Sequence, residues 1–237
     1  MEIMTDVYLT FDFCQDETFQ TNAELKNRLY DLISQSYINV KELIDRIYIV
    51  NDIAFVARHQ ETIVGILFYS FGHRNTFYIN DEKITAIYNG YAVTDLSYRN
   101  NGVLQKLIQF STTYFCDRIK TDHARLLLYA ITSNPFALRA YRKVCPYLEP
   151  FENGSFTDNG RQIARQLKQV LGINRQDGKH PFTFNTTLPQ RYSDFEQQNL
   201  RQAPEKERSF LQALGVDEQA GDRIIFFWLT NPLPAGL

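Results

Sequence analysis

Four residues with anion-binding chemistry stand in a row at positions 99–102, which read Arg-Asn-Asn-Gly and directly precede an apolar helical pattern. The first turn of a helix exposes unpaired N–H groups and a partial positive charge. Glycine lets a backbone approach an anion closely, and Asn tolerates unusual turn conformations. Together with the Arg99 cation, these groups could hold a diphosphate. The alternative is an ordinary turn with Arg99 in solvent, because the segment matches neither the Walker A nor the GxGxxG pattern.

A second candidate group lies in the segment SNPFALRAYRKVCP, residues 133–146. Asn134 followed by Pro135 is typical of a helix start, since Asn is a favoured cap and Pro a favoured first residue. Ala137 and Tyr141 are four residues apart and therefore share a helix face. Tyr141 could act as a general acid, because an unperturbed pKa of about 10 keeps a tyrosine protonated at neutral pH. It could equally be a packing residue, as most of the fourteen tyrosines must be.

With these residues in register, the chain resembles the GCN5-related N-acetyltransferase (GNAT) family. Members of that family have an R/Q-x-x-G-x-G/A turn after the fourth strand and an N-x-x-A-x-x-x-Y-x-K-x-G-F stretch after the fifth. The segment VTDLSYRNNGVL corresponds to the first motif, and Asn134, Ala137, Tyr141 and Lys143 stand in register with the second. The resemblance covers about residues 1–151 and is sharpest over 91–146.

The resemblance implies direct transfer of an acetyl group from acetyl-coenzyme A (acetyl-CoA) to a primary amine of a small molecule or peptide, without a metal. It also implies that two strands splay apart, so that pantetheine pairs with the backbone as an added strand would. An N–H near Val93 would hold the oxyanion, and Tyr141 would protonate the leaving sulfur. The residues implied to bind the cofactor are Ala92, Val93, Thr94, Arg99, Asn100, Asn101, Gly102, Val103, Leu104 and Asn134.

Two features leave a different class of function open. Leu104 stands where the family has a small residue, and we expect its side chain to point into the core and leave only its N–H for the phosphate. No general base is evident, because the strand over 84–94 has no internal carboxylate and Asp95 lies just beyond it. The upstream candidates Glu42, Asp45 and Asp52 have the alternative of being surface charges. The alternative is therefore a catalytically inactive CoA-binding or regulatory protein, an interaction protein on the same fold.

The apolar patterns predict an α/β fold with a central mixed sheet and helices on both of its faces. A helix capped by Asn22 and a second helix near 40–47 precede a hairpin of strands 53–59 and 62–71. Gly90, inside the next strand, indicates a bulge. The continuous apolar run 125–131 is typical of a strand buried on both faces. The remaining expected elements are a polar loop over 72–83, a strand over 84–94, and helices after Gly102, from Pro135 to before Pro146 and over 159–172.

The residue pattern changes after Phe151, and this change predicts that the chain is divided into three parts. Residues 1–151 would form the acyltransferase-like core, and residues 152–222 a helical or polar insertion. Residues 223–237 would supply a last strand, RIIFFWL, that returns to the core sheet. The insertion could shape the acceptor pocket, form a homodimer or dock a partner.

Composition excludes several classes of protein. A formal net charge of −2 argues against general nucleic-acid binding. Three widely separated cysteines and four histidines without HxxxH spacing predict neither a disulfide framework nor a metal site. The N-terminus does not read as a signal peptide, and no apolar run approaches the ~20 residues of a membrane span. We therefore expect a cytoplasmic protein with no membrane partner.

Overall fold

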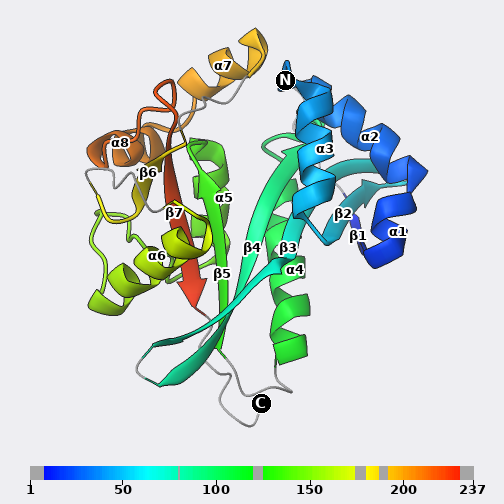
Figure 1. Ribbon diagram of the computed structural model, residues 1–237. Helices are drawn as coiled ribbons and strands as arrows, with labels where there is room; N and C mark the ends of the chain where they lie inside the picture. The colour runs from blue at the N-terminus through cyan, green and yellow to red at the C-terminus, as the bar shows by residue number, and fades with distance from the viewer. Residues whose placement is uncertain (1–7, 80, 120–124, 174–179, 187–191, 230–237) are drawn as a thin grey trace.

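A seven-stranded mixed sheet organises the computed structural model, which describes residues 8–79, 81–119, 125–173, 180–186 and 192–229. The strands lie in the order β1-β2-β3-β4-β5-β7-β6 (Figure 1). Their bounds are β1 Thr10–Gln15, β2 Ile53–His59, β3 Thr62–Ile79, β4 Glu82–Thr94, β5 Arg125–Thr132, β6 Thr183–Asn185 and β7 Asp222–Leu229. The helices are α1 Asp16–Thr21, α2 Ala23–Ser34, α3 Val40–Val50, α4 Val103–Ile119, α5 Pro135–Val144, α6 Asp158–Val170, α7 Asp194–Arg201 and α8 Glu205–Ala213.

The fold class predicted from the sequence, a mixed sheet flanked by helices, is confirmed. Strands β4 and β5 are parallel, and the other pairings are antiparallel. A parallel pair requires a crossover, and α4 supplies it. Strand β5 lies between β4 and β7, as its continuous apolar run predicted. Strand β7 also pairs with β6, which comes from the 152–222 region.

Helices cover both faces of the sheet because side chains alternate along each strand. In β2, the side chains of Phe55 and Ala57 belong to the larger core, which includes Leu107 and Phe115 of α4. Ala54 and Val56 point to the opposite face and join a second core with residues of α1, α2 and α3. The two cores therefore fix α4 on one face of the N-terminal half of the sheet and the first three helices on the other.

Predicted helix boundaries were confirmed where a capping residue or a proline marked them. The Asn22 side chain accepts a hydrogen bond from the Leu25 amide at the start of α2. Helix α5 begins at Pro135 and ends at Val144, before Pro146. The prediction of a polar loop over 72–83 was wrong, because β3 continues to Ile79 and β4 begins at Glu82. The polar stretch belongs to a long hairpin because its two strands pair with each other. Composition alone does not show that pairing.

The central feature of the sheet is the divergence of β4 from β5. Their ladder runs from Ile84 opposite Arg125 to Asn89 opposite Ala130 and then ends. Beyond Asn89, β4 continues to Thr94 paired with β3 alone. Figure 1 shows the two strands leaning apart toward the end of the molecule where α7 lies. The splay that the family resemblance implied is thus present.

Gly90 forms the predicted bulge at the point of divergence. Phe68 of β3 lies opposite Tyr91, but the next residue, Tyr69, lies opposite Asn89, so Gly90 is skipped. A Cβ atom on Gly90 would lie 2.1 Å from Oδ1 of the buried Asn51. The Asn51 amide is held in place by its own hydrogen bond to the Ile47 carbonyl, 2.9 Å away. The bulge therefore requires glycine because Asn51 packs directly on its α-carbon.

We predict that Gly90→Ala lowers the free energy of unfolding by about 1–3 kcal/mol, the usual cost of overpacking a buried site. Denaturant unfolding monitored by circular dichroism measures this change. Asn51→Ala provides the control, because it removes the group that the new methyl would meet. The Gly90→Ala/Asn51→Ala double variant should lose less stability than the sum of the two single variants. Simple additivity would show that Asn51 does not set the requirement for glycine.

Candidate functional site

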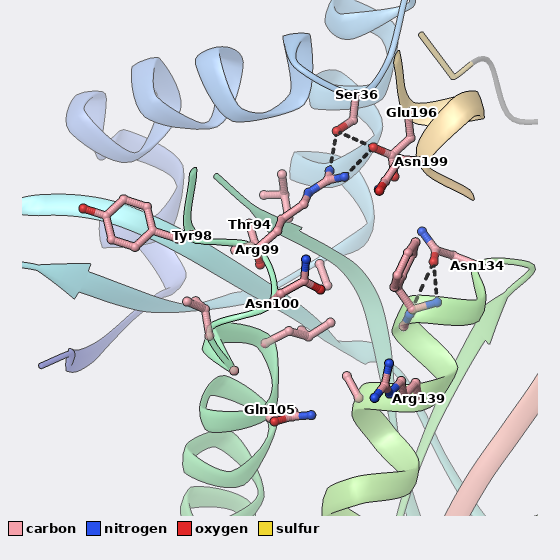
Figure 2. Close-up of a pocket in the computed structure, with 18 of the residues that line it drawn as sticks. Ser36, Thr94, Tyr98, Arg99, Asn100, Gln105, Asn134, Arg139, Glu196 and Asn199 are labelled. Atoms are coloured by element: carbon pink, nitrogen blue, oxygen red, sulfur yellow. Dashed lines mark hydrogen bonds and ion pairs between the residues drawn. The ribbon is translucent and has the colours of Figure 1, made fainter. Parts of the chain in front are cut away.

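A cavity of about 390 Å³ lies beside the end of β4, beyond the point where this strand has parted from β5. One wall comes from the end of β4 and the start of α4, and the other from α5 (Figure 2). Residues from the loop after α2 and from α7 complete the lining. Among the residues predicted from the sequence, it is lined by Ala92, Val93, Thr94, Arg99, Asn100, Gly102, Val103, Leu104 and Asn134. Nine of the ten predicted cofactor residues thus share one cavity, and Asn101 is the tenth.

The strand side of the cavity is a backbone edge. Ala92, Val93 and Thr94 pair through one edge of β4 with Leu67, Ile66 and Gly65 of β3. Among the described residues, no strand lies against their other edge, since the β5 ladder ends at Asn89. Buried backbone groups need hydrogen-bond partners. An extended ligand with amide groups could provide them along this edge.

The turn before α4 has the conformation that its composition predicted. Asn100 has φ +68° and Gly102 has φ +74°, which is the left-handed region that Asn and Gly tolerate. The first helical hydrogen bond runs from the Lys106 amide to the Gly102 carbonyl at 3.0 Å. The amides of the first turn, from Val103 onward, therefore have no acceptor within the helix. They lie at the cavity wall and carry the positive end of the helix dipole.

Leu104 is only partly directed into the core. The neighbouring Val103, and not Leu104, is fully buried in the core, with 2% of its surface exposed. Leu104 is half-buried, packs against the larger core and also lines the cavity. The expectation that only its N–H would face the ligand therefore needs correction. Its side chain thus contributes to the cavity wall beside the start of α4.

Arg99 does not point at the amides of the α4 turn. Its Nη1 forms an ion pair with Oε2 of Glu196 at 2.5 Å, and its Nη2 donates to Oγ of Ser36 at 2.7 Å (Figure 2). Glu196 belongs to α7 and is 3% exposed. Arg99 is thus neither the solvated cation nor the free phosphate ligand that the sequence allowed. It connects two walls of the cavity.

Asn134 and Tyr141 occupy different positions in the site. The Asn134 side chain accepts hydrogen bonds from the amides of Phe136 and Ala137, at 2.9 and 3.3 Å, so it caps α5 while it lines the cavity. Tyr141 is 5% exposed and lies outside the cavity lining. Its hydroxyl donates to Oδ1 of Asn89, the last β4 residue paired with β5. Tyr141 therefore lies at the apex of the splay, which is the point where β4 and β5 part.

Burial determines the protonation of Tyr141. Loss of water and the neighbouring Tyr69 and Cys145 raise the pKa of Tyr141 well above its ordinary value. The Asn89 amide group is fixed in turn, because its Nδ2 donates to the Phe68 carbonyl at 2.8 Å. Tyr141 is consequently a neutral, oriented phenol throughout the neutral pH range.

Two cations at the cavity were not among the predicted binding residues. Arg139 and Lys143 are exposed, line the cavity and lie four residues apart on one face of α5. Within the described residues, neither has an ion-pair or hydrogen-bond partner. The i, i+4 spacing of two cations downstream of Asn134 is the sequence signal that could have identified them. Glu196 and Ser36 gave no such signal.

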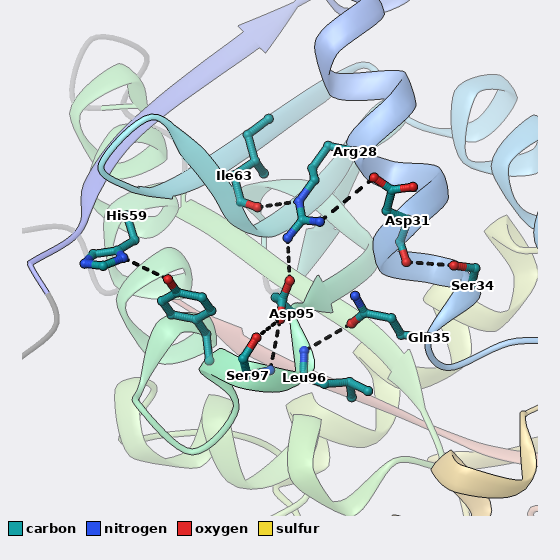
Figure 3. Close-up of polar contacts among 10 residues, drawn as sticks. Arg28, Asp31, Ser34, Gln35, His59, Ile63, Asp95, Leu96 and Ser97 are labelled. Carbon is teal, nitrogen blue, oxygen red and sulfur yellow. Dashed lines mark hydrogen bonds and ion pairs between the residues drawn. The ribbon is translucent and has the colours of Figure 1, made fainter. Parts of the chain in front are cut away.

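A polar network behind the site holds the turn that carries Arg99 (Figure 3). Asp95 follows β4 directly, and its carboxylate pairs with the Arg28 guanidinium of α2. The same carboxylate accepts a hydrogen bond from the Ser97 amide at 2.9 Å. Arg28 also donates through Nε to the Ile63 carbonyl at 2.7 Å, which ties the network to β3. The Asp95 carboxylate is thus committed to this network.

These contacts lower the pKa of Asp95. Burial alone would raise it, but hydrogen bonds from Ser97 and the Arg28 cation outweigh burial, so the pKa lies below its ordinary value of 3.8. A carboxyl group whose pKa is lowered by folding stabilises the protein above the unfolded-state pKa. That contribution disappears as the pH falls through the folded-state value.

No protein-family model and no curated protein matches the chain. It is similar to solved acetyltransferase structures. An aminoglycoside acetyltransferase from an uncultured soil metagenomic sample is 17% identical, with a TM-score of 0.38 over 58% of this chain and 87% of that chain. The ribosomal-protein-S18-alanine N-acetyltransferase from Escherichia coli is 11% identical, with a TM-score of 0.43 over 96% and 99%. A GNAT acetyltransferase from Streptococcus pneumoniae is 17% identical, with a TM-score of 0.35 over 59% and 84%.

At these identities and TM-scores the likeness assigns neither a family nor an activity to this chain. Two further observations concern the described residues alone. No cluster of three or more His, Cys, Asp or Glu side chains there is arranged to hold a metal ion. No helix in the same part of the chain is long and apolar enough to cross a membrane.

We predict that Asp95→Asn lowers the free energy of unfolding at pH 7 by about 1–3 kcal/mol, because it leaves the half-buried Arg28 without its anion. The difference from wild type should begin to shrink as the pH falls below 3.8, where the Asp95 carboxyl of the unfolded chain becomes protonated, and should disappear as the pH falls through the lower folded-state pKa. Urea unfolding at pH 7 and at pH 3 measures both effects.

Asp31→Asn is the matched control for this prediction. Asp31 approaches the same Arg28 guanidinium at 4.0 Å but is 64% exposed, so its removal should cost little. Equal losses in the two variants, or a loss in Asp95→Asn that does not change with pH, would contradict the assigned role of Asp95.

Proposed function

We propose that the chain is a member of the GNAT family that transfers an acetyl group from acetyl-CoA to a primary amine of a small molecule or peptide. One observation carries the proposal. The ladder between β4 and β5 ends at Asn89, directly beside a cavity that places a free strand edge next to a helix N-terminus. A pantetheine arm can pair with the strand edge, and a diphosphate can bind at the helix N-terminus.

The cofactor would be bound by three parts of the cavity. Its pantetheine amides pair with the β4 edge from Ala92 to Thr94. Its diphosphate accepts hydrogen bonds from the first-turn amides of α4, including those of Val103 and Leu104. Its phosphates also meet the unpaired cations Arg139 and Lys143, which bring positive charge to the opposite wall.

The chemistry would take place at the apex of the splay. The neutral amine attacks the thioester carbon, and an amide near Val93 donates to the oxyanion. When the tetrahedral intermediate collapses, the C–S bond breaks and the Tyr141 hydroxyl gives its proton to the thiolate. The proton lost by the amine nitrogen restores Tyr141, so the net reaction moves one proton from nitrogen to sulfur.

A catalytically inactive CoA-binding protein is the second candidate, and one observation favours it. The Tyr141 proton is already donated to Asn89, and the hydroxyl lies outside the cavity lining. An acid in that position acts only if the thioester reaches the apex. Binding of CoA without acetyl transfer to any amine is what this alternative predicts.

The first test separates the two candidates. We expect wild-type protein to bind CoA in titration calorimetry and to release free CoA thiol when acetyl-CoA and a panel of primary amines are supplied. Tyr141→Phe should lower kcat by about 10²–10⁴-fold, the usual contribution of a general acid. Its Kd for CoA should remain that of wild type, because Tyr141 does not line the cavity.

Tyr147→Phe is the control, since Tyr147 follows α5 closely and is 68% exposed. It should behave as wild type. A Tyr141→Phe variant that folds and retains full kcat would remove Tyr141 from the mechanism. A wild-type protein that does not bind CoA would contradict both candidates.

A second test concerns the cations on α5. Arg139→Gln combined with Lys143→Gln should raise the Kd for CoA about tenfold or more, because each removed cation loses a charge-assisted contact to phosphate. Binding of acetyl-pantetheine, which has no phosphate, should not change. Arg165→Gln, an exposed cation of α6 outside the cavity, should leave both affinities unaltered. Equal losses for both ligands would place the two cations outside the phosphate site.

A further inference from the structure

We infer that α7 closes the open end of the cofactor cavity, so that CoA enters and leaves only when the Arg99–Glu196 ion pair opens. Three side chains form this closure, which we call the clasp: Ser36, Arg99 and Glu196. The inference rests on the proposed use of the cavity for CoA. It assigns to the 152–222 region control of cofactor exchange.

The clasp joins the two halves of the molecule that the splay separates. Ser36 follows α2 and Arg99 follows β4, so both belong to the N-terminal half. Glu196 lies on α7, between β6, which pairs with β7, and α8, which packs on α5. Figure 2 shows the three side chains meeting above the diverging strands, with Thr94 on one side and Asn134 on the other.

Backbone contacts continue the same connection. The Ser193 amide donates to the Ser36 carbonyl at 2.8 Å. Tyr37 and Tyr192 form an antiparallel bridge, and their ring centroids are 5.1 Å apart. The segment that leads into α7 is therefore held against the segment that leaves α2. This is a specific closure across the cleft and not a loose loop above it.

Burial makes the clasp a two-state element. Glu196 and Ser36 are each 3% exposed, and the Ser36 hydroxyl donates to Oε2 of Glu196 at 3.4 Å. A carboxylate at this depth is stable only while its cation and hydrogen-bond donor remain in place. Partial opening would leave a buried charge without a partner. The clasp is thus either closed with all three contacts made or open with Glu196 in water.

The position of the clasp links it to the ligand. Ser36, Arg99 and Glu196 all line the cavity that holds the β4 edge. A pantetheine arm that pairs along this edge docks sideways, as a strand joins a sheet. With the clasp closed, its three side chains are joined across the cavity that this edge lines. Loading and release of CoA therefore both require the open state, and both rate constants scale with the fraction of open molecules.

Glu196→Gln tests the inference, because it keeps the shape of the side chain and removes its charge. Stopped-flow measurement of CoA binding and displacement should show the association and dissociation rate constants each raised about tenfold. The Kd should change less than threefold, since both rate constants share the opening step. Glu205→Gln, the same substitution at an exposed position of α8, should show wild-type rate constants. Arg99→Gln should reproduce the effect of Glu196→Gln, and the double variant should add little to it.

The outcomes distinguish this inference from the proposed function. CoA binding by wild type with unchanged rate constants in Glu196→Gln would overturn the clasp and leave the proposed function intact. A lower Kd with an unchanged dissociation rate constant would also overturn it, because Glu196 would then only compete with phosphate for Arg99. Failure of wild type to bind CoA would overturn the proposed function and the clasp together.

A second variant tests the closure without altering the ion pair. Tyr37→Cys with Tyr192→Cys places two thiols at a bridged pair of positions, where the Cα separation suits a disulfide. Oxidation by glutathione disulfide, verified by peptide mass mapping, should slow CoA dissociation at least tenfold relative to the same protein reduced by dithiothreitol. Equal dissociation rate constants in the two redox states would overturn the inference.

Discussion

The divergence of two hydrogen-bonded strands is the constraint on which the rest of this structure depends. A strand edge that leaves its partner exposes amide and carbonyl groups, and such groups are stable only with new acceptors and donors. At the apex, two side-chain hydrogen bonds fix the last residue of β4 that pairs with β5. The Phe68 carbonyl, at the bulge, accepts from Asn89, and the Asn89 side chain accepts from Tyr141 of α5. Beyond the apex the edge borders a cavity. The bulge and its hydrogen bonds therefore hold β4 apart from β5 and leave an edge of β4 to which an extended ligand could pair.

The charges around the cavity are divided between two tasks. Of the cations that line the cavity, Arg99 lies closest in sequence to the N-terminus of α4, yet it is neutralised by the buried Glu196. Arg139 and Lys143, on the opposite wall, have no anion among the described residues and leave net positive charge facing the α4 turn. An anion is consequently attracted from the α5 side, while the Arg99 guanidinium serves to join α7 to the loop after α2. The two tasks cannot be exchanged between these cations. A buried cation such as Arg99 needs an anionic partner, whereas the exposed Arg139 and Lys143 are stable in water without one.

Local patterns in the sequence predicted the parts of the site that depend on neighbouring residues. The left-handed Asn100 and Gly102, the Asn134 cap and the Gly90 bulge each follow from residue type and position. The contacts that were not predicted join distant segments. Arg99 and Glu196 are 97 positions apart, and α7 and α8 are short helices with too few apolar residues for a clear period. Only the polar end of the β3–β4 hairpin, residues 72–83, was wrongly predicted as a loop, because pairing between the two strands is not visible in the composition of that stretch.

The position of Tyr141 bears most directly on whether the site performs chemistry. A general acid for a leaving thiolate must carry a proton at neutral pH and must be held in a fixed direction. Burial satisfies the first requirement by raising the pKa of Tyr141, and Asn89 satisfies the second. A packing tyrosine would not need its hydroxyl at the apex, where an apolar ring would avoid the cost of burying a polar group. The pairing with Asn89 also gives a reason for an amide at the last paired position of β4. The polar apex therefore supports the proposed role of Tyr141 as the acid at the point where the strands part.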